Sequence, residues 1–522
     1  MILSSLSKVL LHEEPTAQIN KFTSILNEPV SFQFAYFCDA GKSNLKIVAP
    51  EELKITVYAV EHVPIETKQG DDDFIINGGK PGLYPDPLIP ISDGDYHVKN
   101  SGWNTLWFEV QSDVAGEYNI EITVNGKTEK TSVTIYDCEK PERTFIYTSW
   151  FHSDCLATHY DVPVFSEEHW GIIENFIECA AKHGQTMILT PLFTPPLDTE
   201  PGSERPTVQL VDVEKVNKKY HFNFDKLDRW IALCDKYGIK YFEFSHLFSQ
   251  WGAKFAPKIM GKKDGEYVRL FGWETKASGI AYRSFLLQFI PAMHEYIKKR
   301  NLADRAYFHV SDEPGFKDLT SYTRAHRSLR PLISKYKHID ALSERAFFAK
   351  KLVQIPIPGE EAFHKFDGIN IERWIYYCCG PNHGNYSNRF IFHPSLRTRF
   401  FGTCMYKYNC VGFLHWGYNF WYTQLSKEEI NPYENTTAGG KFPAGDGFVV
   451  YPGENGKAYP SIRLKQVRDM LDDYEALKLL EKRMTKYEID ELLPRGLDFN
   501  KYPHDDMWLL NLRNKVNFLL KR

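Results

Sequence analysis

The chain has 522 residues, of which 43% are hydrophobic and 25% charged, and this length and composition are typical of a soluble globular protein with two or three domains. The 63 Lys and Arg against 67 Asp and Glu give a net charge of −4, and the absence of a basic stripe with interleaved aromatic residues argues against nucleic acid as a partner. Aromatic residues make up 15% of the chain, with 11 Trp and 30 Tyr. Flat aromatic faces of this kind suit sugar rings, bases or partner proteins.

Cysteine usage and hydropathy point to an intracellular compartment. Residues 1–14 lack a charged leader, a long apolar segment and a small-residue cleavage site, and no run reaches the roughly 18 apolar residues of a membrane span. The nine cysteines are scattered without paired spacing, which fits free thiols. Adjacent Cys378 and Cys379 lack partners at zinc spacing and are interpreted as small strand residues. The sequence therefore predicts a cytoplasmic protein with no membrane span, and it leaves the oligomeric state undetermined.

Residues 1–138 alternate between apolar and polar residues with a period of two, as strands do. The last two of these strands are joined by Asn125-Gly126, a pair that supplies two positive-φ positions and so predicts a tight hairpin. Repeated short strands with turn residues between them predict an N-terminal β-sandwich domain over residues 1–138. The strands expected here lie at 32–36, 55–58, 106–110, 118–124 and 128–136.

From residue 144 the pattern changes to strands that alternate with amphipathic helices, which predicts an α/β fold: a (β/α)8 TIM-type barrel over residues 139–482. A C-terminal helical tail, residues 483–522, is expected to pack on the barrel. The helix after the fifth strand is short and poorly marked. The eight predicted strands are 145–151, 186–190, 240–246, 306–310, 338–342, 352–357, 373–379 and 410–416. The clearest predicted helices are 167–183, 224–237, 280–299, 319–336 and 461–482.

Two acids stand side by side at the end of the fourth predicted strand. Asp312 and Glu313 follow an apolar stretch and precede Pro314, which stops the strand. Adjacent carboxylates in a poorly solvated cleft cannot both ionise easily, so at least one pKa is expected to be raised. A carboxyl with a raised pKa is what a general acid needs near neutral pH. The alternative is a solvated turn, where Asp and Glu are common.

Other polar and aromatic residues follow the predicted strands, and the loops at this end of a barrel carry its chemistry. A rim of Trp, Tyr, His and Asn around a carboxyl pair suits a sugar, because aromatic faces stack on its C–H patches while polar groups bond its hydroxyls. Of the tryptophans after the eighth strand, Trp416 or Trp421 is expected to be the exposed stacking platform. The residues predicted to bind substrate are His246, Trp251, Tyr377, Trp416, Asn419, Trp421, Asp446 and Arg463.

Three hypotheses for the carboxyl pair remain open. In ordinary retaining hydrolysis, Glu313 protonates the leaving oxygen and a second carboxylate about 5 Å away attacks the sugar. Residues 312–314 resemble the Asn-Glu-Pro of many barrel glycosidases, but the nucleophilic Glu that those enzymes carry after strand seven is replaced here by residues 377–379, Tyr-Cys-Cys. In substrate-assisted hydrolysis, the 2-acetamido oxygen of the sugar is the nucleophile, Asp312 polarises the acetamido N–H, and Glu313 is the acid and base. The third hypothesis is a non-catalytic carbohydrate-binding surface.

Several motifs taken together resemble one family. From about residue 144 to residue 483 the chain resembles the catalytic domain of glycoside hydrolase family 123, also catalogued as domain of unknown function 4091, whose members are β-N-acetylgalactosaminidases. The N-terminal strands also fit that family's architecture. The motifs that carry the resemblance are residues 311–314, 245–246 with 250–252, 374–378, 414–421, 445–447 with 451–452, and 460–463 ahead of 473–475.

The resemblance implies a retaining mechanism by neighbouring-group participation, in which Asp312 and Glu313 match the family's catalytic pair. It implies that no metal or other cofactor is needed, in line with the lack of His, Cys or carboxylate groups at ligand spacing among the strand ends. The expected substrate is a glycan or glycolipid with a terminal β-linked N-acetylhexosamine, with N-acetylgalactosamine favoured over its epimer.

Overall fold

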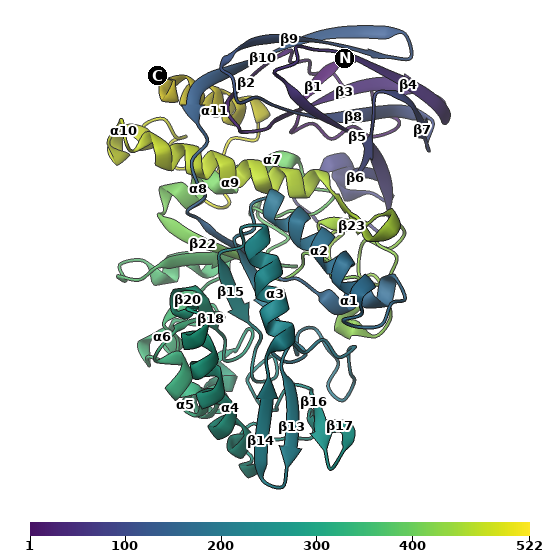
Figure 1. Ribbon diagram of the computed structural model, residues 1–522. Coiled ribbons are helices and arrows are strands. Elements are labelled where there is room, and N and C mark those ends of the chain that lie inside the picture. The colour runs from purple at the N-terminus through teal and green to yellow at the C-terminus, as the bar shows by residue number, and fades with distance from the viewer. Residues whose placement is uncertain (522) are drawn as a thin grey trace.

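The computed structural model describes residues 1–521 and has a mixed α/β fold built around a nearly closed barrel of eight parallel strands (Figure 1). Seven of the eight strands fall within the predicted ranges, and the strand at 337–341 begins one residue before its predicted range of 338–342. At the seam, the Tyr376 amide donates to the Pro358 carbonyl at 3.0 Å, so the edge strands β20 and β21 meet there. In sheet order the strands are β20 (Ile355–Ile357), β19 (Lys337–Ala341), β18 (Ala306–Phe308), β15 (Tyr241–Phe244), β12 (Met187–Thr190), β11 (Ile146–Ser149), β22 (Cys410–His415) and β21 (Arg373–Tyr376).

These segments form barrel strands because both of their faces are buried. Parallel strands covered on both sides consist of nearly continuous apolar residues, as in Met-Ile-Leu-Thr of β12 and Tyr-Phe-Glu-Phe of β15. Inward-facing residues such as Met187, Leu189 and Ile339 pack into one apolar cluster inside the barrel. Glu243 is the polar exception within β15, and it takes part in the site described below.

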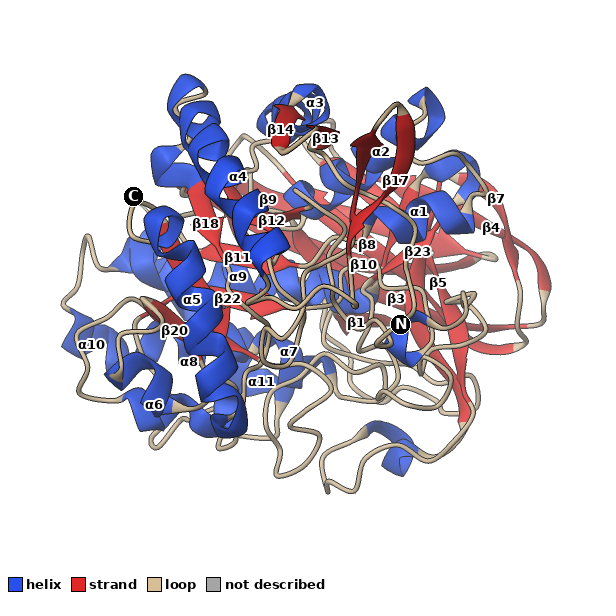
Figure 2. Cartoon of the chain, turned by 90° about the horizontal axis from the view of Figure 1, so that it is seen from below, coloured by secondary structure: helices blue, strands red, loops and turns tan. Residues whose placement is uncertain are grey.

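Helices surround the barrel, and five of them fall on the predicted helical ranges. The helices α4 and α5 run side by side on its outside (Figure 2). Among residues 1–521, no helix combines the length and the apolar character that crossing a membrane requires. The barrel-domain helices are α1 (Ser153–His159), α2 (Glu167–Lys182), α3 (Asp225–Lys236), α4 (Ile280–Lys299), α5 (Leu319–Ile333), α6 (Arg345–Ala349), α7 (Ser395–Arg399), α8 (Phe401–Lys407) and α9 (Ile462–Leu480).

A small four-stranded sheet, in the order β14-β13-β16-β17, extends from the barrel at the bottom of Figure 1. None of these four strands was predicted, although Asp264-Gly265, with both φ angles positive, is a typical hairpin turn that could have marked one pair. The strands are β13 (Asp212–Val216), β14 (Lys219–Asn223), β16 (Ile259–Lys263) and β17 (Glu266–Phe271), and a separate pair is β23 (Val450–Pro452) with β24 (Ala458–Pro460).

The N-terminal residues form two separate five-stranded sheets, whose apolar side chains share one hydrophobic cluster. The predicted hairpin is confirmed: β9 and β10 are joined by Asn125 and Gly126, with φ angles of 50° and 80°. One sheet has the order β1 (Ile2–Ser4), β3 (Val30–Cys38), β8 (Gly102–Gln111), β5 (Lys54–Ile65) and β6 (Gly82–Ile91). The other has the order β2 (Lys21–Leu26), β10 (Lys127–Glu139), β9 (Gly116–Val124), β4 (Gly41–Val48) and β7 (Gly94–Val98).

The helix α9 lies between the N-terminal sheets and the barrel, and it is buried along its length except for Lys478 and Leu479 (Figure 1). Two further helices follow it, α10 (Lys486–Asp490) and α11 (Asp506–Leu520). The helix α11 contacts α9 and also the N-terminal strands β2 and β10. The tail was expected to pack on the barrel, and α11 also reaches the N-terminal sheets.

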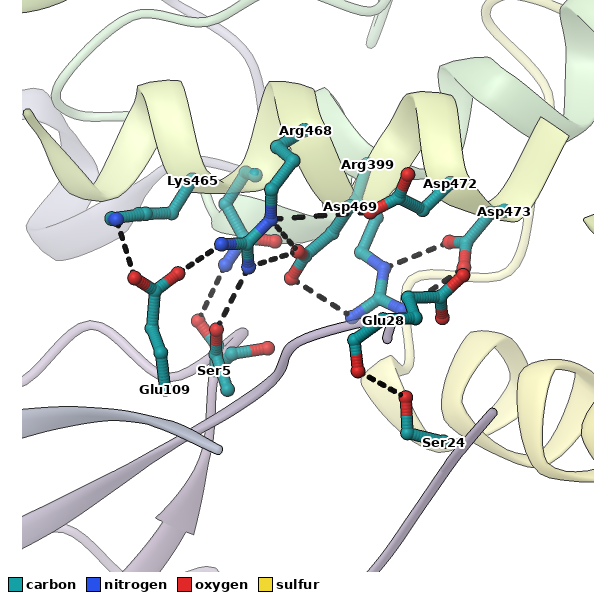
Figure 3. A network of polar contacts seen from close by, with 12 residues as sticks. Ser5, Ser24, Glu28, Glu109, Arg399, Lys465, Arg468, Asp469, Asp472 and Asp473 are labelled. Carbon is teal, nitrogen blue, oxygen red and sulfur yellow. Dashed lines mark hydrogen bonds and ion pairs between the residues drawn. The ribbon is translucent and has the colours of Figure 1, made fainter. Parts of the chain in front are cut away.

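Charged residues of α9 are paired across this junction (Figure 3). Lys465 Nζ lies 2.6 Å from Glu109 Oε2 of β8, and Arg468 pairs with the other oxygen of the same carboxylate. Burial raises the pKa of Glu109, but Arg468 and Lys465 outweigh it and hold that pKa below its usual range. An unpaired buried charge is strongly destabilising. Separating the N-terminal sheets from α9 would leave these charges unpaired, so the pairing stabilises the junction.

Candidate active site

A cavity of about 200 Å³ lies among the residues that follow the carboxyl ends of the barrel strands. Parallel strands all point the same way, so the residues after their ends gather at one end of the barrel. Acids, tryptophans, a tyrosine and two thiols share this cavity. Its wall consists of Trp150, Leu197, Asp198, Gln250, Trp251, Asp312, Glu313, Ala341, Tyr376, Cys378, Cys379, Leu414, Trp416, Gln424 and Phe442.

Asp312 and Glu313 both line this cavity, as neighbours beyond the end of β18. Asp312 is half-buried, and burial, followed by repulsion from Glu313, raises its pKa well above its usual range. The expectation that one acid of the pair has a raised pKa is thereby confirmed. Glu313 is exposed and has a φ of 40°, a conformation that costs a non-glycine residue energy and is concentrated at functional sites.

Tyr376, the last residue of β21, touches the acid pair. Its hydroxyl donates a hydrogen bond to Glu313 Oε1 at 2.7 Å. Burial and the Glu313 charge raise the pKa of Tyr376 well above its usual range, so this hydroxyl keeps its proton near neutral pH. The next residue, Tyr377, was predicted to contact substrate, but it is fully buried outside the cavity wall. Successive side chains of a strand point to opposite faces, so Tyr376 and not Tyr377 lines the cavity.

The loop after β15 is attached to the acid pair through Ser311. The Ser311 hydroxyl donates to the Ser249 carbonyl at 2.9 Å and accepts from the Ala253 amide at 3.1 Å. The Trp251 amide donates to the Asp312 carbonyl at 3.0 Å, and its indole lines the cavity with 42% of the side chain exposed. Gln250 is only 4% exposed, and its Oε1 has no partner within residues 1–521. This loop therefore contributes the aromatic face of Trp251 and the unpaired acceptor oxygen of Gln250 to the cavity wall.

Trp416 also lines the cavity, and a buried carboxylate holds its indole in place. Its indole nitrogen donates to Asp446 Oδ2 at 3.0 Å. Asp446 is fully buried, and burial raises its pKa to about 7. Arg463 pairs with Asp86 of β6 at 2.8 Å and donates to the Gly445 carbonyl at 2.5 Å, beside Asp446. Asp446 and Arg463, predicted to bind substrate, lie outside the cavity wall and instead hold Trp416 and its loop.

The remaining three predicted binding residues are buried behind the wall. Asn419 accepts from the His152 amide at 2.9 Å and donates to the His152 carbonyl at 3.0 Å, which fixes the segment after β11. Trp421 is fully buried against the ring of Phe176, so of the two candidate platforms only Trp416 reaches the cavity. His246 is also buried, and its ring stacks on His309 at 4.2 Å.

A buried ion-pair network supports the floor of the cavity. Glu243 Oε1 accepts from the Trp150 indole at 2.7 Å and lies 2.6 Å from His309 Nε2. His309 Nδ1 lies 3.1 Å from Asp340 Oδ1. Burial alone would lower the pKa of His309, but the two carboxylates raise it to about 9. The imidazolium therefore neutralises the carboxylate that holds Trp150 in the cavity wall.

His246, His309 and Asp340 also offer ligand atoms within 4.8 Å of one another, the only such group among the described residues. Both ring nitrogens of His309, however, already face carboxylates. A metal would have to displace one of these contacts, so the donor set fits an ion-pair network better than a metal centre. The expectation of a metal-free site stays a prediction.

Comparison with known proteins decides the family. A model described as the glycoside hydrolase 123 catalytic domain matches residues 150–480, more than half of the chain. The chain belongs to glycoside hydrolase family 123. It is therefore a glycoside hydrolase, and the resemblance read from its motifs is confirmed.

One solved structure shares the fold of this family 123 chain. A family 123 glycoside hydrolase from Clostridium perfringens, solved in a study of glycolipid glycan hydrolysis, is 15% identical, with a TM-score of 0.74 over 99% of this chain and 97% of that chain. A family 2 β-galacturonidase from Eisenbergiella tayi is 9% identical over 85% of this chain and 89% of that chain, with a TM-score of 0.32. No match was found among curated protein sequences. At these identities the first likeness shows the fold alone, and the second carries no argument.

Three features of the family 123 cavity were not predicted from the sequence. Trp150 directly follows the first barrel strand, a position that could have marked it. Asp198 lies in the long segment after β12, its Oδ2 accepts from the Leu425 amide at 2.9 Å, and burial raises its pKa. No local pattern distinguishes such a loop carboxylate. Cys378 and Cys379, interpreted as strand residues, follow β21 and line the cavity.

The neighbours Tyr376 and Tyr377 provide a matched test of the site. Tyr376→Phe removes the hydroxyl that donates to Glu313, and a hydrogen bond to a charged group contributes about 1.5–3 kcal/mol. We expect kcat/KM for glycoside hydrolysis to fall roughly 10- to 100-fold. Tyr377→Phe removes a buried hydroxyl that has no partner within residues 1–521, and it should leave the rate nearly unchanged. Equal losses in the two variants would contradict the assignment.

The His309 network predicts how stability depends on pH. The pKa of His309 rises from about 6.5 in the unfolded chain to about 9 in the folded protein. A raised cation pKa contributes stability that is fully present below about pH 6.5 and is lost as pH rises through about 9, on the order of 3 kcal/mol in all. Urea unfolding at pH 6.5, 8 and 9.5 measures this loss, and His309→Gln should flatten it. A stability that stays level or rises over this range in the unaltered protein would contradict the imidazolium.

Proposed function

We propose that this hydrolase removes terminal β-linked N-acetylhexosamine from glycans or glycolipids by substrate-assisted catalysis, with Asp312 and Glu313 as the catalytic pair. The observation that carries the proposal is the composition of the cavity wall. Two acids lie side by side on one strand end, and the end of β21 contributes Tyr376, Cys378 and Cys379 but no carboxylate. A nucleophile supplied by the substrate removes the need for one at that position.

In the first step the 2-acetamido oxygen attacks the anomeric carbon, and the bond to the leaving oxygen breaks. The Asp312 carboxylate accepts a hydrogen bond from the acetamido N–H and stabilises the positive charge of the oxazolinium ion. Glu313 gives its proton to the leaving oxygen. In the second step Glu313 takes a proton from water, and the water oxygen attacks the anomeric carbon from the side that the leaving group vacated. The bond between the acetamido oxygen and the anomeric carbon breaks, so the oxazolinium ring opens and the sugar keeps its anomeric configuration.

The raised pKa of Asp312 is compatible with these roles. In the free protein, burial and the neighbouring carboxylate favour a proton on Asp312. An acetamido N–H donated to Asp312 favours its ionised form. Binding of an N-acetylated sugar then favours the Asp312 carboxylate, so the anion that polarises the acetamido group forms only when a substrate with its own nucleophile is bound.

The galacto configuration is favoured by family membership, and the aromatic faces of Trp416 and Trp251 in the cavity wall suit the apolar face of such a sugar. The solved family 123 enzyme from Clostridium perfringens is described as acting on glycolipid glycans. For the present chain we propose the same broad class, a glycan or glycolipid with an exposed N-acetylgalactosamine.

Conventional retaining hydrolysis stays a second candidate because one observation favours it. Asp198 places a third carboxylate in the cavity wall, and it could attack the sugar in place of the acetamido group. The hydrogen bond from the Leu425 amide occupies Oδ2 of this carboxylate, which makes it a weaker nucleophile than a free carboxylate. Asp198→Asn would abolish turnover in this mechanism and lower it only modestly in the substrate-assisted one.

A panel of p-nitrophenyl β-glycosides tests the proposal. We expect turnover of the N-acetylgalactosaminide, less of the N-acetylglucosaminide, and little of the plain galactoside, because the missing acetamido group is the missing nucleophile. Equal kcat/KM values for the galactoside and its 2-acetamido analogue would refute substrate assistance and favour Asp198 as the nucleophile. Sugar binding without turnover of any glycoside would leave a carbohydrate-binding role.

We also propose the domain arrangement that this function uses. The two N-terminal sheets form one β-sandwich domain over residues 1–138, the barrel of residues 139–482 carries catalysis, and residues 483–522 form a helical tail. The shared hydrophobic cluster of the two sheets supports the sandwich. The position of α11 against α9, β2 and β10 supports a tail that joins the two larger parts.

A further inference from the structure

Two neighbouring thiols stand in the cavity wall beside the acid pair. Cys378 is half-buried, Cys379 is exposed, and their sulfur atoms lie 3.9 Å apart. The backbone there is held in place, since the Cys378 carbonyl accepts from Asn388 Nδ2 at 2.9 Å. Neither sulfur takes part in the hydrolysis proposed above. Two thiols that lie on one fixed segment and line one cavity can both bond to a single ligand atom.

We propose that Cys378 and Cys379 form a vicinal dithiol site that binds trivalent arsenicals, and that the bound arsenical blocks the cavity. Thiolates select soft, thiophilic ions and metalloids. With an arsine oxide, the arsenic–oxygen double bond and two S–H bonds break, two arsenic–sulfur bonds form, and the oxygen leaves with both protons as water. Arsenic stays in the +3 state, so no oxidant or reductant is required.

The geometry favours this ligand over a direct disulfide. Consecutive Cα atoms are about 3.8 Å apart across a trans peptide, whereas disulfide-linked Cα atoms are usually roughly 4.4 to 6.8 Å apart. A bond between Cys378 and Cys379 would therefore be strained and easily reduced. An arsenic atom between the sulfurs lengthens the ring and removes this constraint.

The other thiols of the chain compete poorly for the same reagent. Of the remaining seven, only Cys38 is accessible in part, at the end of β3 in the N-terminal sheets. The rest are Cys138, Cys155, Cys179, Cys234, Cys404 and Cys410, all of them buried. Reaction in the folded protein should therefore concentrate at the cavity, and Cys38→Ser provides the matched control.

The test uses the full chain with phenylarsine oxide, followed by intact mass measurement and thiol titration. We expect one arsenical per chain, a loss of two titratable thiols, retention in excess monothiol, and release by a dithiol. Two bonds to one segment raise retention about 100-fold or more over one bond. Cys378→Ser and Cys379→Ser should lose the arsenical to the monothiol, whereas Cys38→Ser should keep it. Retention by either cavity variant equal to that of the unaltered protein would overturn the proposal.

Peptide mapping of the unaltered protein keeps the test independent of how well the variants fold. Bound arsenical should protect Cys378 and Cys379 from alkylation, and protection of another pair would refute the site. The binding readouts do not depend on the proposed function, but the blocking effect rests on it. Full turnover of the N-acetylgalactosaminide by the arsenical-loaded protein would overturn the blocking claim. If the untreated protein hydrolyses no glycoside, the proposed function fails while mass and mapping still decide the dithiol site.

Discussion

Glu313→Gln is expected to lower kcat on substrates with a poor leaving group, such as an oligosaccharide, by roughly 10²–10⁴, the usual contribution of general acid catalysis. The amide has nearly the same shape as the carboxyl but cannot donate the proton that the departing oxygen needs. On a p-nitrophenyl glycoside the loss should be much smaller, because this leaving group departs without protonation. Comparing kcat/KM of the two substrate types for the variant and the unaltered protein measures the difference.

A suitable control is Glu372→Gln, at the opposite end of β21 from the cavity. Glu372 is exposed and pairs with Lys337 at 2.6 Å, and exposed pairs contribute little. Its loss should leave both rates nearly unchanged. If Glu313→Gln reduces hydrolysis of both substrate types by the same factor, Glu313 does not act as the acid on the leaving group.

Asp312→Asn is expected to lower the rate on both substrate types together, by roughly 10²–10³, the cost of removing one preorganised electrostatic contact from a transition state. The oxazolinium ion forms in the same step whatever the leaving group is, and without the Asp312 carboxylate the acetamido N–H loses the anion that accepts its hydrogen bond. Steady-state kinetics on the same two substrates, with circular dichroism to verify folding, measure this effect.

A thiazoline analogue of N-acetylgalactosamine provides an independent check on Asp312. It copies the bicyclic intermediate, so it should inhibit at concentrations far below the substrate's KM, and Asp312→Asn should lose most of that affinity. Asp198→Asn is the comparison variant and should keep it. If the thiazoline binds no better than the free sugar and Asp198→Asn is inactive, the mechanism is attack by Asp198 and not substrate assistance.

The sequence by itself determined the strands of the barrel, its five main helices and the acid pair. The strand and helix ranges of the barrel depend on local periodicity and burial, and the Asn125-Gly126 hairpin depends on two positive φ angles. Asp312 and Glu313 were recognisable because a strand-end motif is contiguous in the chain. The pKa increase of Asp312 also followed from sequence, since neighbouring carboxylates repel wherever they are buried.

Only the tertiary structure decided which other side chains meet that pair. Tyr376, and not Tyr377, faces Glu313 because β21 ends at that residue and alternate side chains point to opposite faces. Asp198 reaches the cavity from a segment more than a hundred residues before the acid pair, and Arg463 pairs with Asp86, 377 positions away. Such contacts depend on how the barrel closes and how α9 packs on the N-terminal sheets. Local propensity carries no information about either, so a single sequence could not assign them.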